Sequence, residues 1–189
     1  MLFRSYEPFW SAVAETGLPM SFHIVAPRHV DLRATFTSTV PGVKENLIAL
    51  TPLGISEVVS TLTFTGVLER HPRLRFVLVE CGVGWIPYFL ERMDQTFEKH
   101  RFWAKSIVTE KPSTYWYRQG HATFIRDLVG MAERHRAGLH NIMWSTDYPH
   151  SDSTWPKSRE ALAEHCRDVP REERALVAGG NAARLYGLG

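Results

Sequence analysis

Three residues that can bind a metal ion or transfer a proton, His23, Glu80 and Asp147, each stand at the end of a short apolar run. A glycine or proline follows each of them within four residues. A neutral imidazole and a carboxylate together suit a borderline metal such as zinc. A metal-bound water can then become a nucleophile near neutral pH while a carboxylate takes its proton. The spacing therefore makes these residues the first candidates for a catalytic metal site.

Each candidate also has a structural interpretation. Asp147 could cap a turn or a helix, as Asp commonly does. His23 could be a hydrogen-bonded core residue. Glu80, ahead of a glycine turn, could accept backbone N–H groups or cap the next helix. Two ligands do not complete a site, because a catalytic zinc needs about three protein ligands. The arrangement imposed by the fold has to decide between these interpretations.

Alternating helices and strands are predicted to position the candidates. Apolar residues at helical spacing, closed by glycine or proline, predict helices, and short apolar or β-rich runs predict strands. Helices are expected at residues 6–16, 55–70, 85–97, 125–135, 157–166 and 171–178, with a helical turn in 179–187. Strands are expected at residues 18–25, 74–80, 117–124 and 141–147. Loops are expected at residues 28–52, with one helical turn around 44–50, and at residues 101–116.

This order requires right-handed crossovers between parallel strands, and it predicts an α/β barrel or an open α/β sheet. The carboxyl ends of parallel strands lie on one face, so we expect His23, Glu80 and Asp147 to converge there. Two further histidines could contact a substrate: His121 within the third strand and His150 in the loop after Asp147. Alternatively, His121 is a core residue and His150 faces solvent.

The composition predicts one soluble cytoplasmic domain over residues 1–189 that acts on a small molecule. Of the 189 residues, 44% are apolar, and 22 basic residues nearly balance 20 acidic ones. That balance argues against a nucleic-acid or anionic membrane partner. Two cysteines, Cys81 and Cys166, are too few for a disulfide framework. No uninterrupted apolar run reaches the roughly 18 residues of a membrane span.

Four segments, in this order along the chain, carry a more specific pattern: Leu18–His23, Val79–Asp94, Met143–Pro156 and Gly180–Gly187. They resemble the amidohydrolase-related family, which includes the aminocarboxymuconate-semialdehyde decarboxylase type and belongs to the metal-dependent hydrolases built on a TIM barrel. The resemblance implies that His23 and Asp147 bind a divalent metal, zinc or alternatively manganese. It also implies that Asp147 handles the proton of a metal-activated water.

The reaction implied is hydrolysis of a small carboxylated or cyclic organic molecule. Glu80 falls where decarboxylase members of the family carry a histidine, and a carboxylate cannot act as an imidazole donor or cation. Glu80 would then orient water or substrate. Two alternatives stay open: a non-oxidative decarboxylase of the same family, and a catalytically inactive half barrel that associates with itself or with a partner.

The resemblance also implies that part of the site lies outside this sequence. The family's first strand supplies a His-x-His or acid-x-His motif, whereas residues 1–22 contain no histidine. A TIM barrel needs about 250 residues and eight strands. We therefore expect the C-terminal half of a TIM barrel, with about four parallel strands and helices outside. Its unpaired edges predict a homo-oligomer or pairing with an N-terminal half barrel.

Overall fold

The computed structural model describes residues 6–24 and 31–188, and its centre is a parallel sheet of four strands in the order β1-β2-β3-β4. The strands are β1 (Met20–His23), β2 (Phe76–Val79), β3 (Gly120–Phe124) and β4 (Ile142–Trp144). Neighbouring strands follow one another in the chain with helices between them. This is the architecture of half a TIM barrel, and it confirms the predicted fold class.

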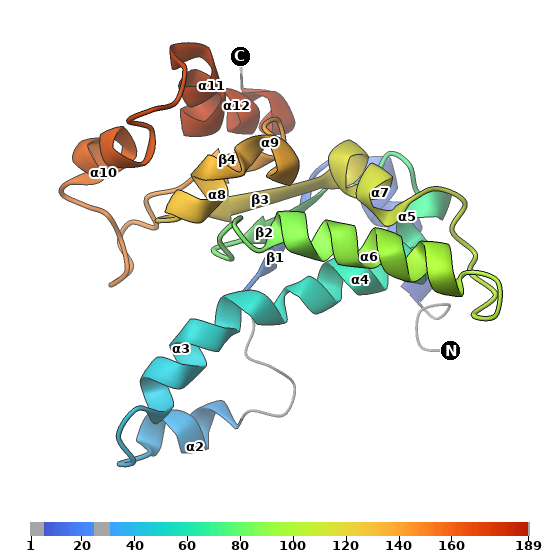
Figure 1. Cartoon of the computed structure of the whole chain (residues 1–189), viewed down its shortest axis with the longest axis horizontal. Coiled ribbons are helices and arrows are strands. Elements are labelled where there is room, and N and C mark those ends of the chain that lie inside the picture. The colour runs from blue at the N-terminus through green and yellow to red at the C-terminus, as the bar shows by residue number, and fades with distance from the viewer. Residues whose placement is uncertain (1–5, 25–30, 189) are drawn as a thin grey trace.

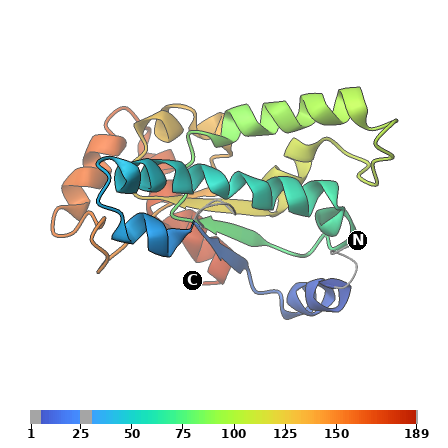
Figure 2. The same cartoon turned by 90° about the horizontal axis from the view of Figure 1, so that it is seen from below.

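Helices connect the strands and cover one face of the sheet, as Figures 1 and 2 show for α4 and α6. Before β2 the chain forms α1 (Glu7–Thr16), α2 (Leu32–Thr37), α3 (Val43–Gly54), α4 (Ser56–Phe64) and α5 (Val67–Arg70). Between β2 and β4 it forms α6 (Ile86–His100), α7 (Pro112–Gln119), α8 (Leu128–Ala132) and α9 (Arg134–Ala137). After β4 come α10 (Ser158–His165), α11 (Arg171–Ala175), the π-helical segment η2 (Leu176–Gly180) and α12 (Asn181–Tyr186).

The core lies between the sheet and these helices. Alternate strand residues, such as Phe76, Leu78 and Phe124, are fully buried in one cluster with apolar residues of α4, α6 and α7. Because side chains alternate along a strand, the residues between them face the other side of the sheet. The paired positions Ser21–Val77–His121 and Thr123–Met143 form that second face, which is the inner face of the half barrel.

The prediction of a loop at residues 28–52 is wrong over most of the described part of that segment, because α2 and α3 occupy it. Asp31 caps α2 by accepting a hydrogen bond from the N–H of Ala34 at 3.0 Å. The threonines that suggested a loop donate hydrogen bonds from their hydroxyl groups to carbonyls one turn earlier in the helix, as Thr51 does to the carbonyl of Leu47 at 2.7 Å. Threonine satisfied in this way is compatible with a helix. Residues 25–30 of the expected strand end and loop lie outside the described residues.

Two other boundaries differ from the prediction. A loop was predicted up to residue 116 and a strand from residue 117. The structure instead has α7 across this boundary, so Tyr117–Gln119 are helical and β3 starts later than predicted. Burial of Tyr115 and Trp116 overrides their β propensity. The helix predicted at 125–135 is divided at Glu133 into α8 and α9. The prediction that α6 starts near Pro87 and that α1 stops at Gly17 is confirmed.

The segment Val43–Phe64, which joins α3 to α4, is long and apolar enough to cross a membrane by length and composition alone. Within it, an 18-residue window has a mean hydropathy of 1.6, and 28% of that window is buried. The two halves differ, because Val59 and Leu62 of α4 belong to the core whereas Ile48 and Leu53 of α3 are exposed. Figure 1 shows α2 and α3 as an arm that extends away from the sheet. The expectation of no membrane partner stays a prediction.

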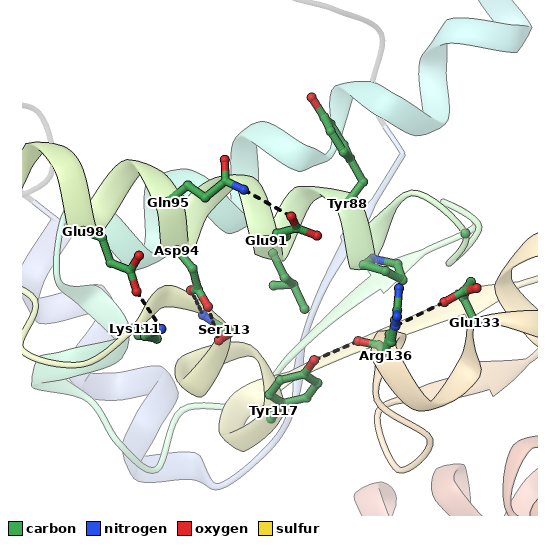
Figure 3. Close-up of a pocket in the computed structure, with 13 residues that line it drawn as sticks. Tyr88, Glu91, Asp94, Gln95, Glu98, Lys111, Ser113, Tyr117, Glu133 and Arg136 are labelled. Atoms are coloured by element: carbon green, nitrogen blue, oxygen red, sulfur yellow. Dashed lines mark hydrogen bonds and ion pairs between the residues drawn. The ribbon is translucent and has the colours of Figure 1, made fainter.

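A polar cavity of about 680 Å³ lies among the outer helices rather than at the strand ends. Figure 3 shows that its charged residues already interact with charged or polar neighbours, as in the Glu98–Lys111 pair, whose Oε1 and Nζ lie 2.6 Å apart. Asp94 of α6 accepts hydrogen bonds from the backbone N–H and the hydroxyl of Ser113, at 2.9 and 2.7 Å. This carboxylate caps the first turn of α7 from outside that helix.

We predict that Asp94→Ala lowers the free energy of unfolding by about 1 kcal/mol or more, since α7 loses the acceptor for its first-turn N–H. Gln95→Ala is the matched control, because Gln95 lines the same cavity but contacts only Glu91 within its own helix. Urea unfolding of both variants measures the difference. Equal stability of the two variants would contradict the capping role of Asp94.

Candidate active site at the carboxyl ends of the strands

The carboxyl ends of β1 and β2 bring His23 and Glu80 together. His23 is the last residue of β1 and pairs in register with Val79, and Glu80 follows directly after β2. Nε2 of His23 lies 3.0 Å from Oε2 of Glu80. The predicted convergence of these residues from segments far apart in the sequence is therefore confirmed as geometry, whereas their chemical roles stay predictions.

Two hydrogen-bonding partners orient the His23 ring. Nδ1 donates to the carbonyl of Ile24 at 3.0 Å, and this directs Nε2 toward Glu80. The hydrogen bond to Ile24, with that to Glu80, raises the pKa of the imidazole above its usual value. The His23 side chain is 63% exposed and that of Glu80 is 18% exposed, so the pair is open to solvent on the histidine side.

Asp147 follows β4 and carries an unsatisfied buried oxygen. Its Oδ2 is buried and receives no hydrogen bond among the described residues. Nδ1 of His150 lies 3.0 Å away, but that nitrogen already accepts a hydrogen bond from the N–H of Asp152 at 3.3 Å. The contact between His150 and Asp147 is an ion pair only when the His150 ring is protonated. A buried carboxylate oxygen without a donor is costly unless a ligand supplies the missing interaction.

Both acids occupy strained backbone. The φ angles of Glu80 and Asp147 are 61° and 56°, in the left-handed region that residues other than glycine rarely adopt. Side chains hold both amides in place: the N–H of Glu80 donates to Oγ1 of Thr123 at 2.9 Å, and that of Asp147 to Oγ of Ser145 at 3.3 Å. Strain of this kind concentrates at functional sites. It supports the functional interpretation of the acids over a capping role.

Asp127, which the sequence analysis did not select, braces the loop that follows Glu80. Its Oδ2 accepts hydrogen bonds from the N–H groups of Val83 and Gly84 at 2.6 and 2.7 Å, and its Oδ1 accepts one from Gly130 at 2.6 Å. The N–H of Asp127 donates to Nε2 of the buried His165 at 3.0 Å. Asp127 lies inside the helix predicted at residues 125–135 and directly before the apolar residues Leu128 and Val129, so an N-cap signal at this position could have identified it.

His121 does not join this cluster. It is the second residue of β3, toward the amino end of the strand, and it lines a separate cavity. Burial lowers the pKa of its imidazole to about 4. Its predicted contact with a substrate stays a prediction, as does that of His150, which lies beside Asp147. Among residues 6–24 and 31–188, no three histidine, cysteine, aspartate or glutamate side chains lie close enough to hold a metal ion alone.

A sequence profile described as Amidohydrolase matches residues 2–188, which is nearly the whole chain. The chain belongs to the amidohydrolase family. The resemblance of the four sequence segments is thereby confirmed at the level of the family. None of the curated proteins compared with this amidohydrolase matches it.

Three solved structures, among those similar to this chain, each match 97% of its length. The 5-carboxyvanillate decarboxylase of Sphingomonas paucimobilis is 26% identical, with a TM-score of 0.76, and 53% of it is covered. An amidohydrolase of Mycobacterium avium subsp. paratuberculosis is 20% identical, with a TM-score of 0.77 and 46% covered. A dihydroxybenzoic acid decarboxylase of Polaromonas, crystallised with manganese and 2-nitroresorcinol, is 18% identical, with a TM-score of 0.70 and 54% covered.

This amidohydrolase chain therefore spans about half the length of the chains that it matches. The match extends over its whole sheet, so the correspondence is to half of a barrel.

The strain at Glu80 leads to a prediction for this chain. Glu80→Gly should be more stable than Glu80→Ala by about 1 kcal/mol, because glycine adopts a positive φ without a Cβ penalty. The control pair is Glu91→Gly and Glu91→Ala on α6, where alanine should be the more stable by about 1 kcal/mol. Thermal or urea unfolding of the four variants measures both differences. The same preference for alanine at both positions would show that Glu80 is not strained.

Proposed function

We propose that this chain supplies the C-terminal half of the active site of a metal-dependent decarboxylase that acts on a small aromatic carboxylic acid. The observation that carries the proposal is its 26% identity to 5-carboxyvanillate decarboxylase over 97% of the chain. The contact between His23 and Glu80, with Asp147 also following a strand at the carboxyl end of the sheet, supports it, because TIM-barrel enzymes place their active sites on that face. The dihydroxybenzoic acid decarboxylase of Polaromonas shares the fold.

The donor atoms fit a divalent metal ion in part. Nε2 of His23 points away from the Ile24 carbonyl and toward Glu80, and it would become a metal donor on losing its hydrogen, while Oδ2 of Asp147 is buried without a hydrogen-bond donor among the described residues. An imidazole nitrogen and a carboxylate oxygen suit zinc or manganese. Two of the similar decarboxylases hold manganese. A bound ion would polarise a substrate oxygen and stabilise developing negative charge. The remaining ligands would come from strands other than these four.

The chain's own acids could supply the proton that decarboxylation requires. When the bond between the ring carbon and the carboxylate breaks, its electron pair stays on the ring carbon, which must take up a proton as CO₂ leaves. A carboxylic acid buried beside the ring is suited to deliver that proton. Asp147, with its side chain only 13% exposed, is our candidate for this role: it would take the proton from water on Oδ1, the oxygen not assigned to the metal, and pass it to the ring carbon. Glu80, whose Oε2 lies 3.0 Å from Nε2 of His23, would orient water or substrate beside the ion.

Hydrolysis of a small organic substrate is a second candidate, favoured by the identity of residue 80. The resemblance places a histidine at this position in decarboxylases, and Glu80 can accept but not donate a hydrogen bond when ionised. A carboxylate there suits the orientation of an attacking water. A third hypothesis is a catalytically inactive half barrel that associates with itself or with a partner.

We also propose that further strands complete the sheet, from a second copy or from an N-terminal half barrel. Among the described residues, β1 and β4 each pair along one edge alone. An unpaired strand edge presents free N–H and carbonyl groups that favour association. The small-molecule site would then be closed on the side where His23 is exposed.

The metal proposal predicts that the chain binds Mn²⁺ or Zn²⁺ in a saturable manner, measured by isothermal titration calorimetry and metal analysis. His23→Ala and Asp147→Asn should each weaken binding about tenfold or more, since each removes a ligand. His135→Ala is the matched control, because His135 is 60% exposed and also pairs with a glutamate, Glu173, at 3.3 Å.

The proposed metal site would be contradicted if His135→Ala weakened metal binding as much as His23→Ala does. It would also be contradicted if the chain bound neither Mn²⁺ nor Zn²⁺. CO₂ release from 5-carboxyvanillate, against hydrolysis of an ester or amide analogue, then separates the two reactions.

The edge proposal predicts self-association in sedimentation velocity. Ser21→Lys should weaken it, because Ser21 is exposed on the inner face of the edge strand β1 and a charge there opposes strand pairing. Ser151→Lys, at an exposed loop position, should have no effect. A chain that stays monomeric at its highest soluble concentration would contradict association between copies.

A further inference from the structure

A second cavity, of about 420 Å³, opens at the amino ends of the strands, opposite the candidate active site. Arg75 contributes from just before β2, His121 from the start of β3, and Arg184 from α12. Arg73 and Arg118 complete its basic lining, and no aspartate or glutamate lines it. The cavity therefore gathers guanidinium groups from separate parts of the chain.

The positive charge of this cavity is not neutralised by neighbouring carboxylates. Arg118 pairs with Glu110 at 2.8 Å, whereas Arg73, Arg75 and Arg184 form no ion pair among the described residues. Three unpaired guanidinium groups exceed the formal net charge of the whole chain, which is +2. These unpaired guanidinium groups therefore give the cavity a local positive charge, which attracts anions.

Hydrogen bonds hold two of these guanidinium groups in position. Nη1 of Arg75 donates to the carbonyls of Pro72 and Leu74 at 3.0 and 3.3 Å. Nη2 of Arg184 donates to Oδ1 of Asn181, a buried residue, at 2.8 Å. A guanidinium carries five N–H groups, so each arginine keeps donors for a ligand. Side chains that are already held in position lose less conformational entropy when a ligand binds to them.

His121 adds an unsatisfied polar atom to the same cavity. Its Nδ1 is buried and has no hydrogen-bond partner among residues 6–24 and 31–188. Burial lowers the pKa of His121, and the positive charges of Arg75 and Arg184 lower it further. The imidazole is therefore neutral near pH 7, and one of its two ring nitrogens carries a hydrogen. A ligand in the cavity that contacts Nδ1 would satisfy it.

We propose that this cavity binds a phosphate group, as inorganic phosphate or as a phosphate monoester. Guanidinium groups recognise phosphate through paired N–H donors, and several arginines around one cavity match an anion with several oxygens better than a single carboxylate. The volume exceeds that of a phosphate ion and leaves room for a small organic group beside it. The site is separate from the candidate metal ligands and does not depend on the proposed reaction.

The test is isothermal titration calorimetry of the full chain with inorganic phosphate in a low-salt buffer, with sodium chloride at matched ionic strength as reference. Saturable binding is expected, with an affinity that falls as salt rises. Arg73→Gln and Arg184→Gln should each raise Kd about tenfold, as expected for loss of a charged hydrogen bond. Arg73 makes no side-chain hydrogen bond to residues 6–24 or 31–188, so its variant separates binding from folding.

Arg159→Gln is the matched control, since Arg159 is an exposed arginine on α10 outside the cavity. An equal loss of affinity in this variant, or no saturable binding to the chain, would overturn the proposal. Benzoate that binds as tightly as phosphate would overturn it as well, because a single carboxylate would then suffice. Phenyl phosphate that binds more tightly than inorganic phosphate would identify a phosphate monoester as the ligand, whereas weaker binding would identify the inorganic ion.

Discussion

The parallel pairing of β1, β2, β3 and β4 is the constraint on which the rest of the structure depends. Strands that run in the same direction need helical crossovers, and burying one face of the sheet against those helices fixes the register. Phe76, Leu78 and Phe124 lie in that buried face. Because a one-residue slip would expose them, the register also fixes which side chains reach the carboxyl ends. The core therefore positions the candidate site without contributing chemistry to it.

The candidate site combines strain with support from the surrounding loops. Glu80 and Asp147 have positive φ angles that cost free energy, and they persist because their neighbours hold them. Asp127 provides much of that support through hydrogen bonds to Val83 and Gly84, which fix the loop after Glu80. His165 ties this arrangement to α10. An acid in the loop after β3 thus supports the geometry of the loop after β2.

The two ends of the sheet differ in charge. The carboxyl ends carry Glu80 and Asp147, whereas the cavity at the amino ends gathers arginines and a neutral histidine. Parallel strands make this division possible, because every strand begins at one end and finishes at the other. The carboxyl end can offer ligands to a cation and the amino end can offer donors to an anion. The same topology therefore provides two sites with opposite preferences.

The sequence by itself determined the alternation of helices and strands and the positions of His23, Glu80 and Asp147 at strand ends, because apolar runs and turn residues are local signals. The family and the half barrel followed from the resemblance of four segments. It could not determine α2, α3 or α7, whose threonines and aromatic residues have weak helix propensity and depend on back-bonding or on burial, as for Trp116. Nor could it identify Asp127, or the grouping of Arg73, Arg75 and Arg184, since these contacts join residues far apart in the chain. Only the tertiary structure decided that His121 faces the basic cavity, because the end of a strand at which a residue lies depends on where the strand begins.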